Sequence, residues 1–528
     1  MKTKKILSFL MAALVAGSLL LVPGCKKTPV DDVKLIIDFS MIKTQIGVTM
    51  VDAKTGHQIQ TGNPEIKIEG QNKNLVMDIS GRDNIKVVNG LASLTLRANA
   101  NPSSANPVKF IVIGTADGYL STSQSVTVNE HGGYSVVLRL VKLNDLPPGV
   151  SGVVDNTDII TGGDGSVLNE AIITAPVVVS TGTSASLTIR KGTVIRDANG
   201  NPLSGTIYTT LVYFTNQDDE AMQSFPGGFN NTVILNDGSE ADVTFFTAGF
   251  LAITMTDASG NAAKTFDPPL EVYMEIPEQT IDHEGNPITS GMEIPLWSYD
   301  EATGVWQQEP ENAQVQQSSG RGVFYAEFEI DHLSWWNLDW FVNSCYIGAT
   351  IIIEKTGCAA DNSVYLELRR ENGDYLAGYY LWLNDGPNPI NLMWVPQNTS
   401  ANLFIKPDYY SDPFAFLFID DLCDGTYTIE IEFTDNLVPV YGLFVGLCPN
   451  NPDIELRPSG YGWYSKANSW WWNTAFVWNG EVSICLEQNT WYTFGTVFDG
   501  VWYQYDFYID QTQYIFEMEM GPDFCDDF

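Results

Sequence analysis

The sequence predicts an all-β protein in which several antiparallel β-sandwich domains follow one another along the chain. Short runs of alternating apolar and polar residues recur between clusters of Gly, Asn, Asp and Pro, for example at 91–96 and 427–433. Strands with this spacing are typical of sandwiches. No long amphipathic helix is visible after residue 25. The chain has 528 residues, 44% of them hydrophobic, so we expect a folded protein that is too long for a single core.

Residues 1–24 have the layout of a signal peptide. Three lysines precede an uncharged apolar run from Ile6 to Val22, and Gly24-Cys25 ends it. The pentapeptide Leu-Val-Pro-Gly-Cys at 21–25 resembles the lipobox of bacterial lipoproteins, in which the cysteine is acylated. This resemblance implies lipidation of Cys25, a lipidated tether over 25–34 and a surface-exposed position on the cell outer membrane. The alternative is an apolar run that is retained as a membrane-spanning helix.

Cysteine usage also fits an exported protein. Six cysteines remain once Cys25 carries lipid, and they are Cys345, Cys358, Cys423, Cys448, Cys485 and Cys525. Six cysteines allow up to three disulfides, and the sequence does not choose among the fifteen possible connectivities. No two of them form a C-x-x-C pair, which disfavours a zinc site.

The formal net charge is −37, and loss of the three signal-peptide lysines brings the mature chain to about −40. An acidic surface of this kind argues against nucleic acid and anionic lipid headgroups as partners. It can collect divalent cations, and Asp155, Asp158 and Asp164 lie in a Gly-rich stretch whose oxygens suit calcium. Their spacing does not match an EF-hand, so a solvated loop without metal is the alternative. We expect no other cofactor.

The first expected domain covers residues 35–146. Its start holds Asp-Ala-Lys-Thr-Gly at 52–56, a strand follows at 64–70, and Ala-Asp-Gly-Tyr-Leu stands at 116–120 near its end. This order of turns and strands resembles carboxypeptidase-regulatory-like and related Ig-like modules, which implies a small sandwich. The prolines of the segment 144–149 then indicate a linker, because proline cannot donate to a β-ladder.

The second expected domain covers residues 150–342. Its blocks at 187–195, 197–205, 225–228, 294–306 and 332–339 resemble the extracellular β-sandwich region of cartilage intermediate layer proteins and FAM171-type membrane proteins, which is itself similar to ZU5-type sandwiches. The resemblance implies an extracellular structural or interaction module and no catalytic residues.

The last two expected domains cover residues 343–450, a β-sandwich, and 451–528, a Trp-rich and disulfide-containing β region. No Trp occurs before Trp297, whereas seven of the fourteen lie at or beyond Trp463. In a strand, Trp470 and Trp472 face one side and Trp471 the other. We therefore expect Trp463, Trp470 and Trp472 to contact a ligand at the surface. The alternative is that these indoles fill the core of a small domain.

Catalytic motifs are missing from the sequence. The four histidines stand in separate turns, and neither H-E-x-x-H nor G-x-S-x-G occurs. Paired carboxylates of a glycosidase are not visible in a sequence. We therefore expect a non-catalytic, lipid-anchored surface protein that binds or adheres to a glycan or protein through its C-terminal β region. The alternatives are a structural accessory subunit of an outer-membrane complex and, less favoured, a carbohydrate-active enzyme.

Overall fold

The computed structural model describes residues 35–38, 42–320, 323–358, 363–383, 386–409, 411–433, 437–448, 451–469, 472–498 and 500–519. Strands make up nearly all the regular structure of these residues, which contain one short 3-10 turn and one four-residue α-helix. Alternating burial is clear along strands such as β11 (Ala185–Ile189) and β24 (Ala401–Lys406), where every second side chain enters a core. The predicted all-β fold is confirmed. No described helix is long and apolar enough to cross a membrane.

Domain 1 (residues 42–146) is a sandwich of two sheets with strand orders β4-β5-β2-β8 and β3-β6-β7. Its elements are β2 (Gln45–Asp52), β3 (Glu65–Glu69), η1 (Lys73–Leu75), β4 (Val76–Asp78), β5 (Leu91–Leu96), β6 (Val108–Thr115), β7 (Thr122–Val128) and β8 (Gly133–Leu140). The apolar side chains between the sheets, Val48, Leu94, Val112 and Leu138 among them, form one core.

Domain 2 (residues 150–342) winds ten strands in the order β10-β11-β16-β19-β18-β17-β20-β15-β13-β9, with β12 and β14 pairing beside this path. They surround a hydrophobic core that continues into domain 3. Its elements are β9 (Val150–Thr161), β10 (Ala171–Thr174), β11, β12 (Val194–Arg196), β13 (Gly205–Phe214), α2 (Asp219–Met222), β14 (Asn230–Ile234), β15 (Glu240–Asp257), β16 (Thr265–Ile276), β17 (Glu293–Asp300), β18 (Val305–Gln317), β19 (Phe324–His332) and the first part of β20 (Trp335–Gly357).

Domain 3 (residues 343–433) begins inside β20, so domains 2 and 3 share one strand. The first part of β20 pairs with β15 and β17, and from Ser344 onward it pairs with β23 and β26. Two sheets result, β23-β20-β26 and β22-β21-β24-β25. The further strands are β21 (Ser363–Arg369), β22 (Tyr375–Trp382), β23 (Gly386–Pro396), β24, β25 (Ala415–Ile419) and β26 (Thr426–Phe433).

Domain 4 consists of residues 437–519 together with 35–38. Its sheets are β30-β29-β32-β33 and β1-β28-β27-β31, and β34 also pairs with β27. The strands are β1 (Leu35–Asp38), β27 (Leu437–Cys448), β28 (Asn451–Arg457), β29 (Gly460–Lys466), β30 (Asn473–Val477), β31 (Glu481–Glu487), β32 (Trp491–Phe498), β33 (Val501–Tyr508) and β34 (Gln513–Glu519). β27 and β28 pair with each other, so the boundary predicted at 450 falls inside this sheet; the structure places it before β27.

Domains 1, 3 and 4 share one topology, which the sequence did not reveal as a repeat. In each, the first strand pairs in parallel with the last: β2 with β8, β20 with β26, and β27 with β34. The opposite sheet is β22-β21-β24-β25 in domain 3 and β30-β29-β32-β33 in domain 4. When β28 is left out of the count, these are the second, third, fifth and sixth strands of each domain. β25 and β33 are therefore equivalent edge strands.

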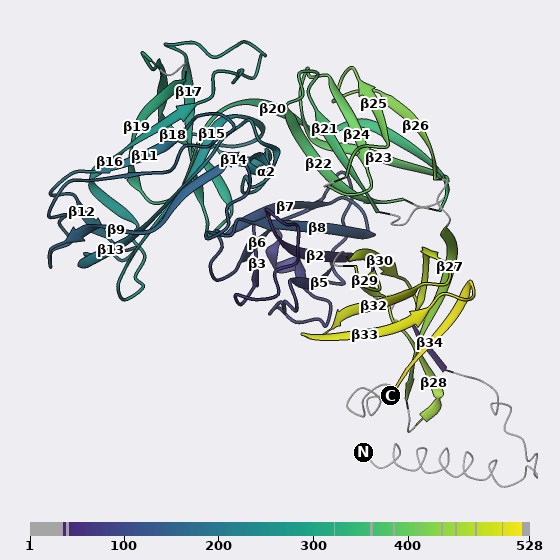
Figure 1. Ribbon diagram of the computed structural model, residues 1–528. Helices are drawn as coiled ribbons and strands as arrows, with labels where there is room; N and C mark the ends of the chain where they lie inside the picture. Colours follow the sequence, from purple (N-terminus) through teal and green to yellow (C-terminus); the bar gives the residue numbers. More distant parts are fainter. Residues whose placement is uncertain are drawn as a thin grey trace, which may run out of the picture.

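Domain 1 lies at the centre of the molecule, and the other three domains surround it (Figure 1). The Tyr299 hydroxyl of domain 2 donates to Ser123 Oγ at 2.5 Å. The Arg139 guanidinium lies 3.8 Å from the centre of the Tyr409 ring in domain 3. Gln45 Nε2 donates to the Val477 carbonyl of domain 4 at 3.0 Å. The domains that follow one another along the chain therefore pack against domain 1 and do not form an extended string.

The N-terminal strand β1 does not belong to domain 1. It pairs in parallel with β28 of domain 4, with Leu35 opposite Ile454 and Asp38 opposite Arg457. The predicted domain 35–146 therefore loses its first residues to the C-terminal domain. Any anchor attached before residue 35 thus connects directly to domain 4.

Candidate binding cleft

Three hairpin turns of domain 2 repeat the sequence D-x-x-G-N at 197–201, 257–261 and 282–286. In each turn, one carboxylate oxygen of the Asp accepts hydrogen bonds from the backbone N–H groups two and four residues later. The other oxygen accepts from the side chain of the final Asn. The Gly has a positive φ of 80–88° in all three turns, a conformation that glycine adopts readily. These bonds lower the pKa of Asp197 and Asp257.

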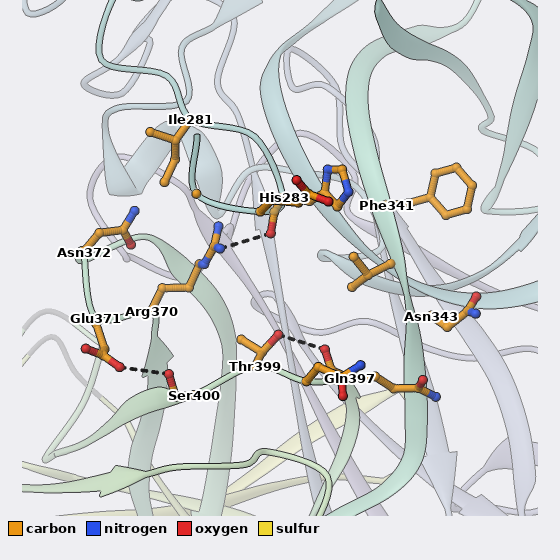
Figure 2. A pocket seen from close by; sticks show the side chains of 14 residues that line it. Ile281, His283, Phe341, Asn343, Arg370, Glu371, Asn372, Gln397, Thr399 and Ser400 are labelled. Carbon is orange, nitrogen blue, oxygen red and sulfur yellow. Dashed lines mark hydrogen bonds between the residues drawn. The ribbon is translucent and has the colours of Figure 1, made fainter. Parts of the chain in front are cut away.

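The third of these turns borders a cleft of about 800 Å³ between domains 2 and 3. Most of its walls are polar, and its shape is open (Figure 2). Domain 2 and the crossing strand β20 contribute Ile281, His283, Glu284, Gly285, Phe341, Val342 and Asn343, and loops of domain 3 contribute Arg370, Glu371, Asn372, Gln397, Asn398, Thr399 and Ser400. Its volume is within the usual range for ligand sites.

Arg370 of domain 3 forms hydrogen bonds across the cleft to domain 2. Its guanidinium donates to the backbone carbonyls of Asp282 at 3.3 Å and His283 at 3.0 Å, and it lies 4.9 Å from the centre of the Phe246 ring. On the domain 3 side, Ser400 donates to the Glu371 carboxylate at 2.9 Å. The Arg370 bond to the His283 carbonyl and the Ser400–Glu371 bond are drawn in Figure 2, and the contacts of Arg370 join domain 3 to domain 2 at the cleft.

His283 supplies an unsatisfied polar atom at the cleft. Its Nδ1 is buried and forms no hydrogen bond with any part of the chain that the structure describes. In the other two turns this position holds Ala198 and Ala258, so the imidazole is not needed for the turn itself. The prediction from sequence missed this site, although the D-x-x-G-N repeat with a histidine in one copy was a visible signal for it.

The structure corrects the predicted aromatic site. Trp463 is 0% exposed and packs with Tyr461 and Val497 against Leu91 of domain 1. Its expected role as a surface contact is therefore wrong, because the sheet face that carries it is covered by a neighbouring domain. Trp472 is half-buried beside Trp502, with ring centres 5.2 Å apart. Trp470 lies outside the described residues.

Five of the six predicted cysteines are disulfide-bonded. Cys345 bonds Cys423 within domain 3, and Cys358 bonds Cys485 across domains 3 and 4. Cys448 is also disulfide-bonded. Cys25 and Cys525 lie outside the described residues.

The calcium candidates are not gathered in space as a cluster. Asp155 and Asp158 belong to strand β9 and not to a loop, and Asp164 follows in a turn where it accepts from the Ser166 N–H at 3.0 Å. Within the described ranges, no three His, Cys, Asp or Glu side chains are arranged to hold a metal ion.

One carboxyl with a raised pKa lies in a domain core and not in a cleft. Asp339 is fully buried in domain 2, and burial raises its pKa well above the usual range. One of its oxygens accepts from the Asn337 side chain, whose own oxygen accepts from Thr247 at 2.9 Å. Because Asp339 is 0% exposed, this group is a structural feature of the core.

No family model matches the chain, and no curated protein matches it. The resemblances of residues 35–146 and 150–342 to named families therefore stay predictions. Similar solved structures include the Bacillus anthracis TIE protein, with 11% identity over 70% of this chain and 74% of that chain and a TM-score of 0.14.

Two pilins are also similar. The minor pilin GBS52 of Streptococcus agalactiae has 8% identity over 33% of this chain and 95% of that chain, with a TM-score of 0.14. The full-length major pilin RrgB of Streptococcus pneumoniae has 8% identity over 91% and 100%, with a TM-score of 0.12. At such TM-scores the class of the protein rests on its own strands: a multi-domain, all-β protein of Ig-like sandwiches with a polar interdomain cleft.

Proposed function

We propose that this is a non-catalytic, lipid-anchored surface protein whose cleft between domains 2 and 3 binds a glycan. The observation that carries the proposal is a mostly polar cleft of about 800 Å³ that is lined by residues of both domains, His283 and Arg370 among them. Amides, hydroxyls and a guanidinium offer donors and acceptors together, which suits the hydroxyl groups of a sugar. All four amide side chains that line the cleft are exposed: Asn343, Asn372, Gln397 and Asn398.

We propose the cleft in place of the aromatic surface as the contact site, since eight of its fourteen lining residues come from domain 3. Lipidation of Cys25 fits this placement. Nine residues lie between Cys25 and β1, and the stretch from Cys25 to Leu35 can span at most about 35 Å. The anchor then holds domain 4 near the membrane. Domains 2 and 3, which border the cleft, lie on the opposite side of the molecule from β28, the partner of β1 (Figure 1).

The anchor is tested by fractionation. The Cys25→Ala variant lacks the cysteine that would carry the acyl chains on which stable anchoring depends. It should therefore leave the membrane fraction and appear as soluble protein. Unchanged membrane association of this variant would argue against the lipid anchor.

Glycan binding is tested with the mature chain carrying Cys25→Ala on an array of bacterial and host oligosaccharides. The double variant His283→Ala/Glu284→Ser gives the third turn the sequence of the turn at 257–261, so the turn should fold as before. Binding of any array ligand should fall at least tenfold. The matched control, Ala258→His/Ser259→Glu, puts the same side chains on a turn that does not line the cleft and should bind normally. Equal binding by both variants would contradict the proposal, as would an array without ligands.

A further inference from the structure

The edge strand β25 of domain 3 carries an exposed row of phenylalanines. Phe416 and Phe418 are 68% and 46% exposed, and Phe414, which immediately precedes the strand, is 41% exposed. These three side chains alternate with Ala415, Leu417 and Ile419, which face the core. Phe404 of β24 lies opposite Phe416, with ring centres 6.5 Å apart, and extends the row. Apolar side chains this exposed mark a contact surface more often than a bare surface.

The backbone of β25 has an open side as well. Among the described strands, β25 pairs with β24 alone. Natural edge strands usually avoid unwanted pairing through proline, charged side chains or bulges. The segment 414–419 contains none of these, and it reads Phe-Ala-Phe-Leu-Phe-Ile. Both edges of the opposite sheet of domain 3 are protected: β26 carries Glu430 and Glu432, and β23 contains three prolines.

The equivalent sheet of domain 4 shows what such a face does in this protein. There the outer face carries Tyr461, Trp463 and Trp502, and domain 1 covers it. In domain 3, β22 of the corresponding sheet approaches β8 of domain 1, and Arg139 of β8 reaches the Tyr409 ring. Among the described aromatic side chains of this face, Phe414, Phe416 and Phe418 on the β25 side are exposed. The Phe row therefore continues a face that already contacts protein elsewhere.

Acidic residues near both ends of β25 indicate which kind of partner binds there. Asp412 precedes the Phe row, Asp420 and Asp421 follow it directly, and Asp424 stands in the next turn. Asp412, Asp420 and Asp424 are exposed. A second copy of this chain, with its net charge of −37, would bring like charges to these ends. A segment with cationic ends is attracted instead.

We propose that β25 is a docking site for an extended segment of a partner protein, which adds as a further strand to the sheet β22-β21-β24-β25. The segment alternates apolar side chains that pack beside the Phe row, and Lys or Arg residues at its ends meet Asp412 and Asp420. Main-chain hydrogen bonds to the free side of β25 supply much of the affinity in this mode of recognition. This inference is independent of glycan binding, and it supports the role of an accessory subunit in an envelope complex.

The probe is a synthetic nine-residue peptide with alternating Val and Thr between two Lys at each end. It is titrated into the mature Cys25→Ala chain by fluorescence anisotropy. The same peptide with Glu ends should bind at least tenfold more weakly. A Lys-ended peptide that is N-methylated at alternate residues should also lose tenfold or more, because N-methylation removes the donors needed for strand addition but keeps the apolar side chains.

Variants of the protein complete the test. Phe416→Ser/Phe418→Ser should weaken binding of the Lys-ended peptide at least tenfold. The control Ile172→Ser removes an equally exposed apolar side chain, 60% exposed, from another edge strand and should leave binding unchanged. Equal binding of the N-methylated or Glu-ended peptide would overturn the proposal. A dimer in sedimentation velocity that dissociates on the Phe substitutions would also overturn it, by identifying a second copy as the occupant.

Discussion

The ring of Tyr461 in domain 4 occupies the space that a side chain at Gly47 of domain 1 would need. A Cβ atom built on Gly47 would lie 2.1 Å from two ring carbons. Tyr461 itself is 0% exposed, and its hydroxyl donates to Ser135 Oγ at 3.3 Å. This contact explains why β2 is buried on both faces, since one face packs on the core of domain 1 and the other on domain 4.

Gly47→Ala should destabilise the protein. The Tyr461 ring is enclosed and cannot move aside, so we expect a loss of about 1–3 kcal/mol in the free energy of unfolding, as for other overpacked sites. Denaturant unfolding measures it. Gly132→Ala is the control, because a Cβ there meets no atom within 4 Å, and it should change stability by no more than about 0.5 kcal/mol. Equal effects of both substitutions would refute the docking of domain 4 on domain 1.

Truncation to Ala should reduce the free energy of unfolding far more at Trp463 than at Trp491. Trp463→Ala empties a fully buried site and should cost about 3–5 kcal/mol. Trp491 is 54% exposed, so Trp491→Ala should cost about 0.5 kcal/mol or less. Thermal melts of the two variants check this, and a stable Trp463→Ala protein would restore the surface role that the sequence suggested.

The bond between Cys358 and Cys485 should hold domain 4 to domain 3. Its removal in Cys358→Ala/Cys485→Ala should cost about 2–5 kcal/mol and should make the segment between domains 3 and 4 more sensitive to limited proteolysis. Cys345→Ala/Cys423→Ala, which lacks the bond within domain 3, is the comparison for proteolysis at this junction. Free thiols at these four cysteines in the denatured, unreduced protein would disprove the pairing.

Asp339 should make stability fall as pH rises. Burial raises its pKa in the folded state, so above the ordinary Asp range, near about 4, the unfolded chain binds fewer protons than the folded one. The free energy of unfolding then decreases with pH until the folded pKa is passed. Asp339→Asn should flatten this slope between pH 5 and 8. Asp237→Asn should not change it there, because Ser239 lowers the pKa of that exposed group. Parallel slopes for wild type and Asp339→Asn would contradict the assignment.

Local patterns in the sequence predicted the strands, because alternation along a strand depends on residues two apart. They did not predict which faces are covered by other domains. The burial of Trp463 depends on Leu91, which is far away in the sequence, and the placement of β1 depends on β28. The boundary at 450 was misplaced because β27 and β28 are adjacent in sequence and paired in one sheet.

One element of the cleft could be predicted from the sequence. The D-x-x-G-N turn at 282–286 could be read in the sequence, but its position opposite Arg370 could not, since the two residues belong to different domains. The shared strand β20 sets this position, and no local signal shows that one strand serves two sheets.

Binding at the cleft is measured most directly by titration calorimetry of the strongest array glycan into the mature Cys25→Ala chain and into its His283→Ala/Glu284→Ser variant. The predicted result is a Kd at least tenfold higher for the variant, with an unchanged Kd for the control Ala258→His/Ser259→Glu. An identical Kd for all three proteins would contradict a binding site between domains 2 and 3.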